Sequence, residues 1–253
     1  MRKRVLILLL CAVSLTAAFF LHLQPRFIVQ KYVLDTEKIF EPIRLVILSG
    51  YQAGNFGPYG AELVECIDSL APDAILIPGN MFSTAQEYDD VLQMFRLLNG
   101  ITYTYFITGE KDHIEYDIDH FREMVSATGV RVIDFSKVKL FLDGEELTIE
   151  GIPRSEILSA NSEEPNNKSK IASSSFHTND VFSIALTNRV ELAEYDHGSP
   201  HFDLVLGGSD DNKLKGIHTQ QDTTVIITQR LLNNDNFLKK LFSRPVLTLV
   251  IVQ

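Results

Sequence analysis

The sequence predicts a mixed, layered α/β fold that is preceded by one membrane-spanning helix. Three observations support this prediction. Strand-length apolar runs alternate with helical periodicity in the first half of the chain, the second half is mostly strand-like, and a long apolar stretch stands near the N-terminus. With 253 residues, 45% of them hydrophobic and 22% charged, the chain has the composition of one sizeable globular domain with a short appendage.

The apolar stretch near the N-terminus runs from Val5 to Leu23 and follows three basic residues at positions 2–4. At a helical rise of ~1.5 Å per residue it spans roughly 28 Å, which is close to the thickness of a bilayer core. The basic residues favour a cytoplasmic location for residues 1–4, so we expect a single-pass anchor over 5–23 and an extracytoplasmic domain in the cell membrane. A signal peptide cleaved near Ala18 is the alternative. The apolar residues 19–21 beyond that point favour a retained anchor.

Residues 24–42 are interpreted as an exposed connector with a strand-like piece from Phe27 to Val33, and the domain is expected over residues 43–253. Continuous apolar runs predict buried strands at 43–48, 74–77, 103–108, 130–135, 182–186, 203–206, 223–228 and 246–252. Helical periodicity predicts amphipathic helices over 61–70, 88–98 and 118–125. Asp143-Gly144 predicts a β-hairpin between residues 138–142 and 145–149. The Ser/Asn-rich stretch 155–180 is expected to form a flexible surface loop.

The charge balance restricts the partners of the chain. A formal net charge of −10 and a pI of about 5.2 describe an acidic surface that repels phosphate backbones, so nucleic acid is excluded as an expected partner. The two cysteines, Cys11 and Cys66, form neither a disulfide framework nor a cysteine-based metal site. The membrane, contacted through the N-terminal helix, is the partner that the sequence indicates.

Five of the predicted strands end in loops that are rich in glycine and polar residues. These loops are residues 49–52, 79–80, 109–112, 187–188 and 207–211. In layered α/β folds the functional loops lie at the carboxyl ends of the strands, so these five segments are the candidate site.

The five loops resemble, in order and spacing, those of the calcineurin-like metallophosphoesterases, and in particular the membrane-anchored bacterial branch of that family. The likeness is carried by ILSGYQAGNFG from Ile47, APDAILIPGN from Ala71 and YFITGEKD from Tyr105. FSIALTN from Phe182 and FDLVLGGSDD from Phe202 support it. The resemblance implies a sandwich of two mixed β-sheets flanked by helices, with a dinuclear metal centre that hydrolyses phosphoesters at the sheet ends.

The sequence departs from this family at the positions that hold the metal. The family's motifs are Asp-x-His, Gly-Asp, Gly-Asn-His-(Asp/Glu), a lone His and Gly-His-x-His. All seven metal-ligand positions and the catalytic histidine position differ here, and they are occupied by Gly50, Gln52, Asn80, Glu110, Lys111, Asn188, Ser209 and Asp211. Within the third motif only Asp112 keeps the character of the family.

These substitutions oppose the family's chemistry. Two divalent ions need imidazoles and carboxylates at ~2.0–2.2 Å, whereas Gly50 has no side-chain donor, Asn80 carries no charge and Lys111 adds a positive one. We therefore expect no catalytic residue and no bound metal. The resemblance then implies a pseudoenzyme that acts by binding or scaffolding, with an unidentified protein partner or an anionic ligand.

Two alternatives remain open at the level of the sequence. One is a divergent phosphoesterase with a rewired, mononuclear site, in which a single divalent cation is held by residual candidates Glu110, Asp112, Asp210 and Asp211. The other is a module that binds an anion or a lipid headgroup in the old cleft.

Overall fold

The computed structural model describes residues 27–51, 53–54, 56–82, 84–109, 111–112, 116–153, 180–188, 202–208, 216–220, 222–228, 231 and 245–253. The expected anchor over residues 5–23 and almost all of the expected loop over 155–180 lie outside these ranges. Within them, no helix is both long enough and apolar enough to cross a bilayer.

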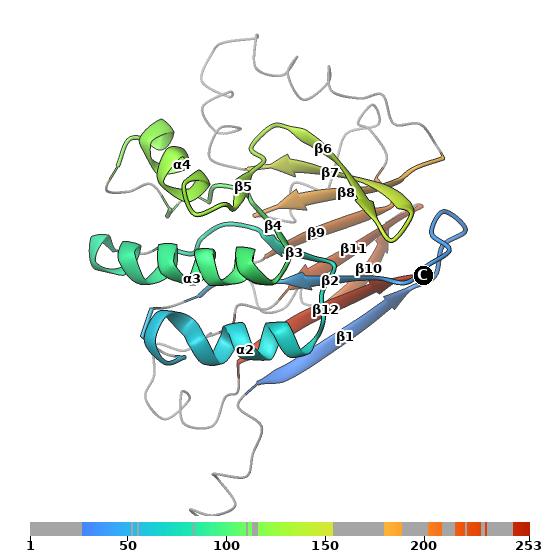
Figure 1. Ribbon diagram of the computed structural model, residues 1–253. Helices are drawn as coiled ribbons and strands as arrows, with labels where there is room; N and C mark the ends of the chain where they lie inside the picture. The colour runs from blue at the N-terminus through green and yellow to red at the C-terminus, as the bar shows by residue number, and fades with distance from the viewer. Residues whose placement is uncertain are drawn as a thin grey trace, which may run out of the picture.

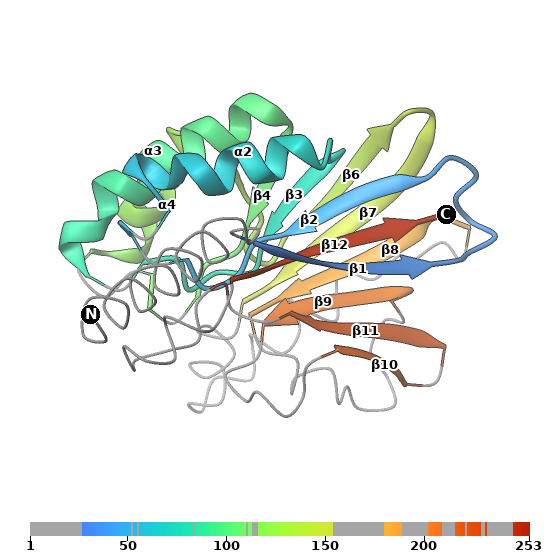
Figure 2. The same ribbon diagram turned by 90° about the horizontal axis from the view of Figure 1, so that it is seen from below.

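Two six-stranded β-sheets form the body of the molecule (Figures 1 and 2). Sheet A has the strand order β1-β12-β2-β3-β4-β5, with β1 (Ile28–Leu34), β12 (Val246–Val252), β2 (Ile43–Ile47), β3 (Ala74–Ile77), β4 (Tyr103–Phe106) and β5 (Arg131–Val132). Sheet B has the order β10-β11-β9-β8-β7-β6, with β10 (Gly216–Gln220), β11 (Thr223–Thr228), β9 (Leu204–Gly208), β8 (Phe182–Thr187), β7 (Glu145–Ile152) and β6 (Lys137–Leu142). Both sheets mix parallel and antiparallel pairs, as expected from the sequence.

Three helices, α2 (Ala61–Ser69), α3 (Tyr88–Ile101) and α4 (Ile118–Ser126), lie on one face of sheet A (Figure 1). Each follows a strand of the parallel part of the sheet, so each begins at the edge where that strand ends. The start of α4 is capped by Asp117, whose carboxylate accepts a hydrogen bond from the N–H of Asp119 at 3.2 Å. Short 3₁₀ turns, η1 (Pro58–Gly60) and η2 (Ala85–Glu87), precede α2 and α3.

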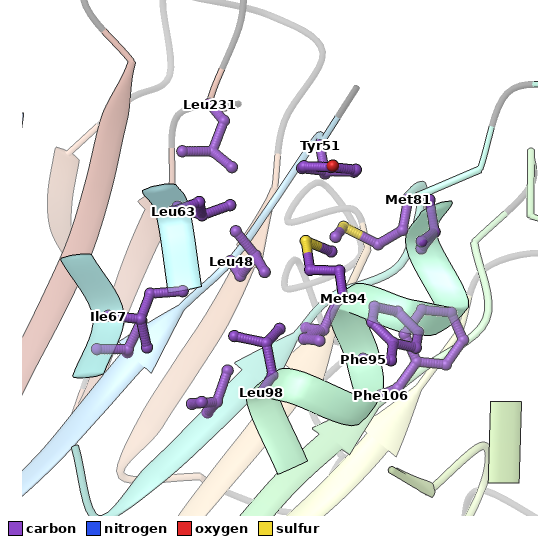
Figure 3. Close-up of a cluster of buried hydrophobic side chains, with 14 of the residues drawn as sticks. Leu48, Tyr51, Leu63, Ile67, Met81, Met94, Phe95, Leu98, Phe106 and Leu231 are labelled. Carbon is purple, nitrogen blue, oxygen red and sulfur yellow. The ribbon is translucent and has the colours of Figure 1, made fainter. Parts of the chain in front are cut away.

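The two largest apolar clusters of the described residues form layers that hold the sandwich together. The first lies between sheet A and the helices and includes Leu48, Met94 and Phe95, as Figure 3 shows. The second lies between the two sheets and includes Leu45, Ile149 and Leu206. Because β2 and β3 are covered on both faces, their sequences are mostly apolar.

The structure adds one strand before the expected domain and one unpredicted strand within it. β1 lies inside the segment expected as a connector, and it pairs with β12 along its full length, so the sandwich begins before residue 43. β10 was not predicted, because its sequence GIHTQ lacks an apolar run, and it adds an antiparallel edge strand to β11. The hairpin at Asp143-Gly144 is confirmed, and both residues have positive φ, as a type I′ turn requires.

Most of the parallel strands end at one side of the molecule, which we call the strand-end edge; these strands are β2–β5 of sheet A and β7, β8, β9 and β11 of sheet B. Loops from the two sheets contact each other at this edge. The side-chain amide of Asn188, after β8, donates to the carbonyl of Thr108, after β4, at 3.4 Å. A Cβ placed on Gly208, at the end of β9, would lie 3.0 Å from the Oγ of Ser49, which follows β2. The fold therefore collects the loops that follow strands far apart in the sequence.

Candidate functional site

The strand-end edge brings together the described members of the predicted site. Gly50, Asn80, Lys111, Asp112 and Asn188 all belong to loops that leave this edge. The other predicted positions, Gln52, Glu110, Ser209, Asp210 and Asp211, lie outside the described residues. The geometry of the candidate site is accordingly that of the loops after β2, β3, β4 and β8.

The loops after β3 and β4 touch backbone to backbone. A Cβ on Gly79 would lie 2.6 Å from the nitrogen of Gly109, and a Cβ on Gly109 would lie 2.4 Å from the nitrogen of Asn80. Gly79 and Asn80 both have positive φ, 74° and 57°, a conformation that glycine adopts freely and asparagine tolerates better than most residues. The glycines are therefore required by close packing of the two loops.

Asp112 holds these two loops together. Its side chain is fully buried. Oδ1 accepts hydrogen bonds from the N–H groups of Met81 and Phe82 at 2.6 and 3.0 Å, and Oδ2 accepts from those of Asn80 and Gly109, both at 2.7 Å. A carboxylate offers about four acceptor sites, so these four donors use its capacity.

The protonation of Asp112 reflects two opposed effects. Burial raises the pKa of its carboxyl group to about 6, while the four backbone donors act in the opposite direction. The backbone carbonyl of Asp112 is also fixed, because it accepts a hydrogen bond from the hydroxyl of Tyr88 at 2.6 Å. The residue is thus tied to β3, β4 and α3 at once.

Asn80 and Lys111 face each other across the same pair of loops. The side-chain oxygen of Asn80 accepts a hydrogen bond from the backbone N–H of Lys111 at 3.3 Å. Lys111 itself is exposed. The amide oxygen of Asn80 therefore stabilises the loop after β4.

Asn188 is buried and donates to Thr108, and Thr108 is fixed in turn by Asp134. The Asp134 carboxylate accepts from the N–H of Thr108 at 2.8 Å and from its hydroxyl at 2.6 Å. Arg122 of α4 completes the group, since its Nε donates to Asp134 at 2.8 Å. Sequence reasoning missed Asp134 and Arg122, because their partners are distant in the sequence and no local motif marks them.

Tyr51 is a buried residue of the candidate loop 49–52 whose partner sequence reasoning did not find. It directly follows Gly50, and its hydroxyl donates to Asp90 of α3 at 2.6 Å. Burial is the main reason why the pKa of Tyr51 is raised, and the hydrogen bond to Asp90 adds to it. Asp90 also accepts from the N–H of Tyr59 at 3.0 Å, so it joins the loop after β2 to the start of α3.

The described donors do not fit a dinuclear metal centre. Asp112 has both oxygens occupied by N–H groups, Asn188 donates its amide N–H to a carbonyl, and Gly50 has no side chain. Among the residues that the structure describes, no group of three or more histidine, cysteine, aspartate or glutamate side chains is placed to hold a metal ion. The polar side chains among them form hydrogen bonds that fix the loops.

Comparisons with known proteins give likeness in structure only. No protein-family model and no curated protein matches the sequence. The structure is similar to the phosphopantetheinyl hydrolase PptH from Mycobacterium tuberculosis, with 10% identity, a TM-score of 0.49, and coverage of 74% of this chain and 89% of that one. It is also similar to the protein TT1561 of Thermus thermophilus, with 16% identity, a TM-score of 0.46 and coverage of 75% and 90%.

A third similar structure is a novel archaeal phosphodiesterase, with 12% identity, a TM-score of 0.39 and coverage of 75% of this chain and 85% of that one. Identities and TM-scores this low carry no information on activity. What this chain does has to be argued from its own residues.

Proposed function

We propose that this protein is a membrane-anchored relative of the calcineurin-like metallophosphoesterases that does not hydrolyse phosphoesters through a dinuclear metal centre. It acts by binding or scaffolding outside the cytoplasm, at the membrane. The single observation that carries the proposal is that Asn80 and Asn188, at two of the substituted ligand positions, are uncharged and hydrogen-bonded within the protein.

The argument follows from charge and from acceptor capacity. A pair of dications needs several anionic or imidazole donors that are free to coordinate. Of the described positions, Asn80 and Asn188 are neutral and hydrogen-bonded within the protein, and Lys111 is cationic. Without a metal there is neither a Lewis acid for the phosphoryl oxygen nor a water molecule with a lowered pKa.

Metal content tests the proposal directly. The full-length chain is purified without chelator, its metals are measured by elemental analysis, and hydrolysis of phosphomonoesters and phosphodiesters is assayed with added Mn²⁺, Zn²⁺ or Fe²⁺. We expect much less than one metal ion per chain and no turnover above background. Two stoichiometric transition metals would refute the proposal, and about one tightly held metal would favour a mononuclear site.

Two variants separate true turnover from contamination. Glu110→Ala and Asp211→Ala remove the two substituted positions that still carry carboxylates. We expect neither variant to change background hydrolysis. Turnover that is present in the native chain and lost in either variant would show that the protein is an enzyme.

A further inference from the structure

The chain enters the sandwich at the strand-end edge. β1 begins at Ile28, which pairs in parallel register with Val246 at the start of β12. β12 runs antiparallel to β2, and its residue Thr248 lies beside Ile47, the last residue of β2. β1 therefore starts at the edge where β2 ends and runs away from it (Figure 2).

Phe27 fixes the position of this entry point. Its side chain is 9% exposed, and its ring centroid lies 5.2 Å from that of Phe56 in the loop after β2. The Phe56 centroid lies 6.1 Å from that of Tyr51, the neighbour of Gly50. From Phe27 onward the chain thus belongs to the packed body, and ring contacts connect it to the first substituted loop.

Only residues 24–26 separate Phe27 from Leu23, where the expected anchor ends. Even when fully extended, the backbone from Leu23 to Phe27 spans at most about 14 Å. We infer that this short tether holds the strand-end edge against the lipid headgroup layer of the membrane. The inference rests on the proposed anchoring.

Electrostatic attraction to lipid does not bring the strand-end edge close to the membrane. Helices α2 and α3 begin at the strand-end edge with Glu62, Asp89 and Asp90 in their first turns, and the whole chain carries −10. An anionic lipid surface repels these carboxylates, so the test uses zwitterionic headgroups. A short tether gives an effective concentration on the order of millimolar, which is enough to populate a contact that is too weak to form in solution.

Headgroup quenching at two matched positions tests the orientation. In a full-length Cys11→Ser, Cys66→Ser background, a fluorophore is attached at Lys111→Cys or at Phe40→Cys. Lys111 follows β4, far from β1 in the strand order, so it reports on the whole edge. Phe40 is 85% exposed in the connection between the end of β1 and the start of β2, which lies at the opposite edge.

The protein is reconstituted in phosphatidylcholine vesicles that contain headgroup spin-labelled lipid. We expect severalfold stronger quenching at position 111 than at position 40. A long Gly/Ser linker inserted between Pro25 and Arg26 should abolish the difference, because the tether no longer restricts the body. Equal quenching at both positions, stronger quenching at position 40, or a difference that survives the linker would overturn the inference.

Membrane retention is measured on the same preparation after a carbonate wash. A chain that is washed off the vesicles would refute both the proposed anchoring and this inference. A chain that is retained but shows no preference between the two positions refutes the inference alone. Metal content and turnover are independent of both results.

Discussion

The two opposite edges of the sandwich are each fastened by an aspartate, but in different ways. Asp112, at the strand-end edge, is fully buried and accepts only from neutral backbone N–H groups. Asp203, at the opposite edge, is partly exposed, accepts from the Nζ of Lys38 at 2.7 Å, and also accepts from the N–H and hydroxyl of Ser183. One carboxylate is thus isolated from cations in the protein interior, and the other is paired and reached by water.

Under the proposed function, the contacts of Asp112 account for loops that keep their shape without a metal. A buried carboxylate without a cation is costly, and it persists where many hydrogen bonds depend on it. Asp112 and the two glycines Gly79 and Gly109 fix the loops after β3 and β4 through contacts within the protein. The shape of these loops therefore does not require a metal.

Removal of Asp112 should have the largest effect on stability. Asp112→Ala leaves four buried N–H groups without their acceptor, and we expect the free energy of unfolding to fall by roughly 3–5 kcal/mol. Asp112→Asn keeps one acceptor oxygen and should lose less. Chemical denaturation measures both variants. An Asp112→Ala protein as stable as the native one would mean that the four hydrogen bonds to Asp112 do not stabilise the fold and that the two edges do not differ in this way.

The pH dependence of stability sharpens the contrast further. The folded-state pKa of Asp112, about 6, lies above the ordinary value of 3.8, so the folded state binds more protons between these values. The free energy of unfolding should therefore fall as the pH rises from about 4 to about 6, by up to roughly 3 kcal/mol, and then level off. Unfolding of the native protein and of Asp112→Asn is compared across this range.

The difference between these two curves isolates the titration of Asp112 from that of the other carboxyl groups. Parallel curves would show that the pKa is not raised in the folded state. A native curve that rises relative to the variant would show that the four N–H donors outweigh the effect of burial.

The ion pair at the opposite edge should contribute least. Lys38 and Asp203 have side-chain exposures of 28% and 24%, and we expect Lys38→Met to reduce the free energy of unfolding by about 0.5–1 kcal/mol, less at high salt. The control is Lys139→Met, which removes the more exposed Lys139–Glu146 pair and should have a smaller effect still. If Lys38→Met were as damaging as Asp112→Ala, the two edges would be equivalent energetically.

The repeating parts of the fold could be predicted from the sequence. β3 over Ala74–Ile77 and β12 over Val246–Val252 coincide with their predicted apolar runs, and α3 and α4 begin at the predicted residues. These elements bury one or both faces, so hydrophobic periodicity reports their environment directly. β5 was predicted over residues 130–135 but has only two residues. It is short because Ile133 turns inward between the sheets and Asp134 makes only an isolated bridge to Gly151.

The order of the site loops could also be predicted, but their internal contacts could not. Asp112 was expected as a residual metal candidate, and the structure shows its oxygens turned to the backbone of residues 80–82 and 109. The pairs Tyr51–Asp90 and Thr108–Asp134 are likewise distant in the sequence. A hydrogen bond between two loops depends on which strands lie side by side. The periodicity of a single sequence does not reveal that arrangement.

The strand order of sheet A has a consequence for how the molecule is assembled during synthesis. β12, formed by residues 246–252, is inserted between β1 and β2, so the first strand has no neighbour within the sheet until the last one arrives. The strands of the βα units from β2 to α4 follow one another along the chain and pair side by side, so these units are free to form during synthesis. Closure of the sheet has to wait for the final strand, and until then β1 and β2 present open backbone edges that invite aggregation or chaperone binding.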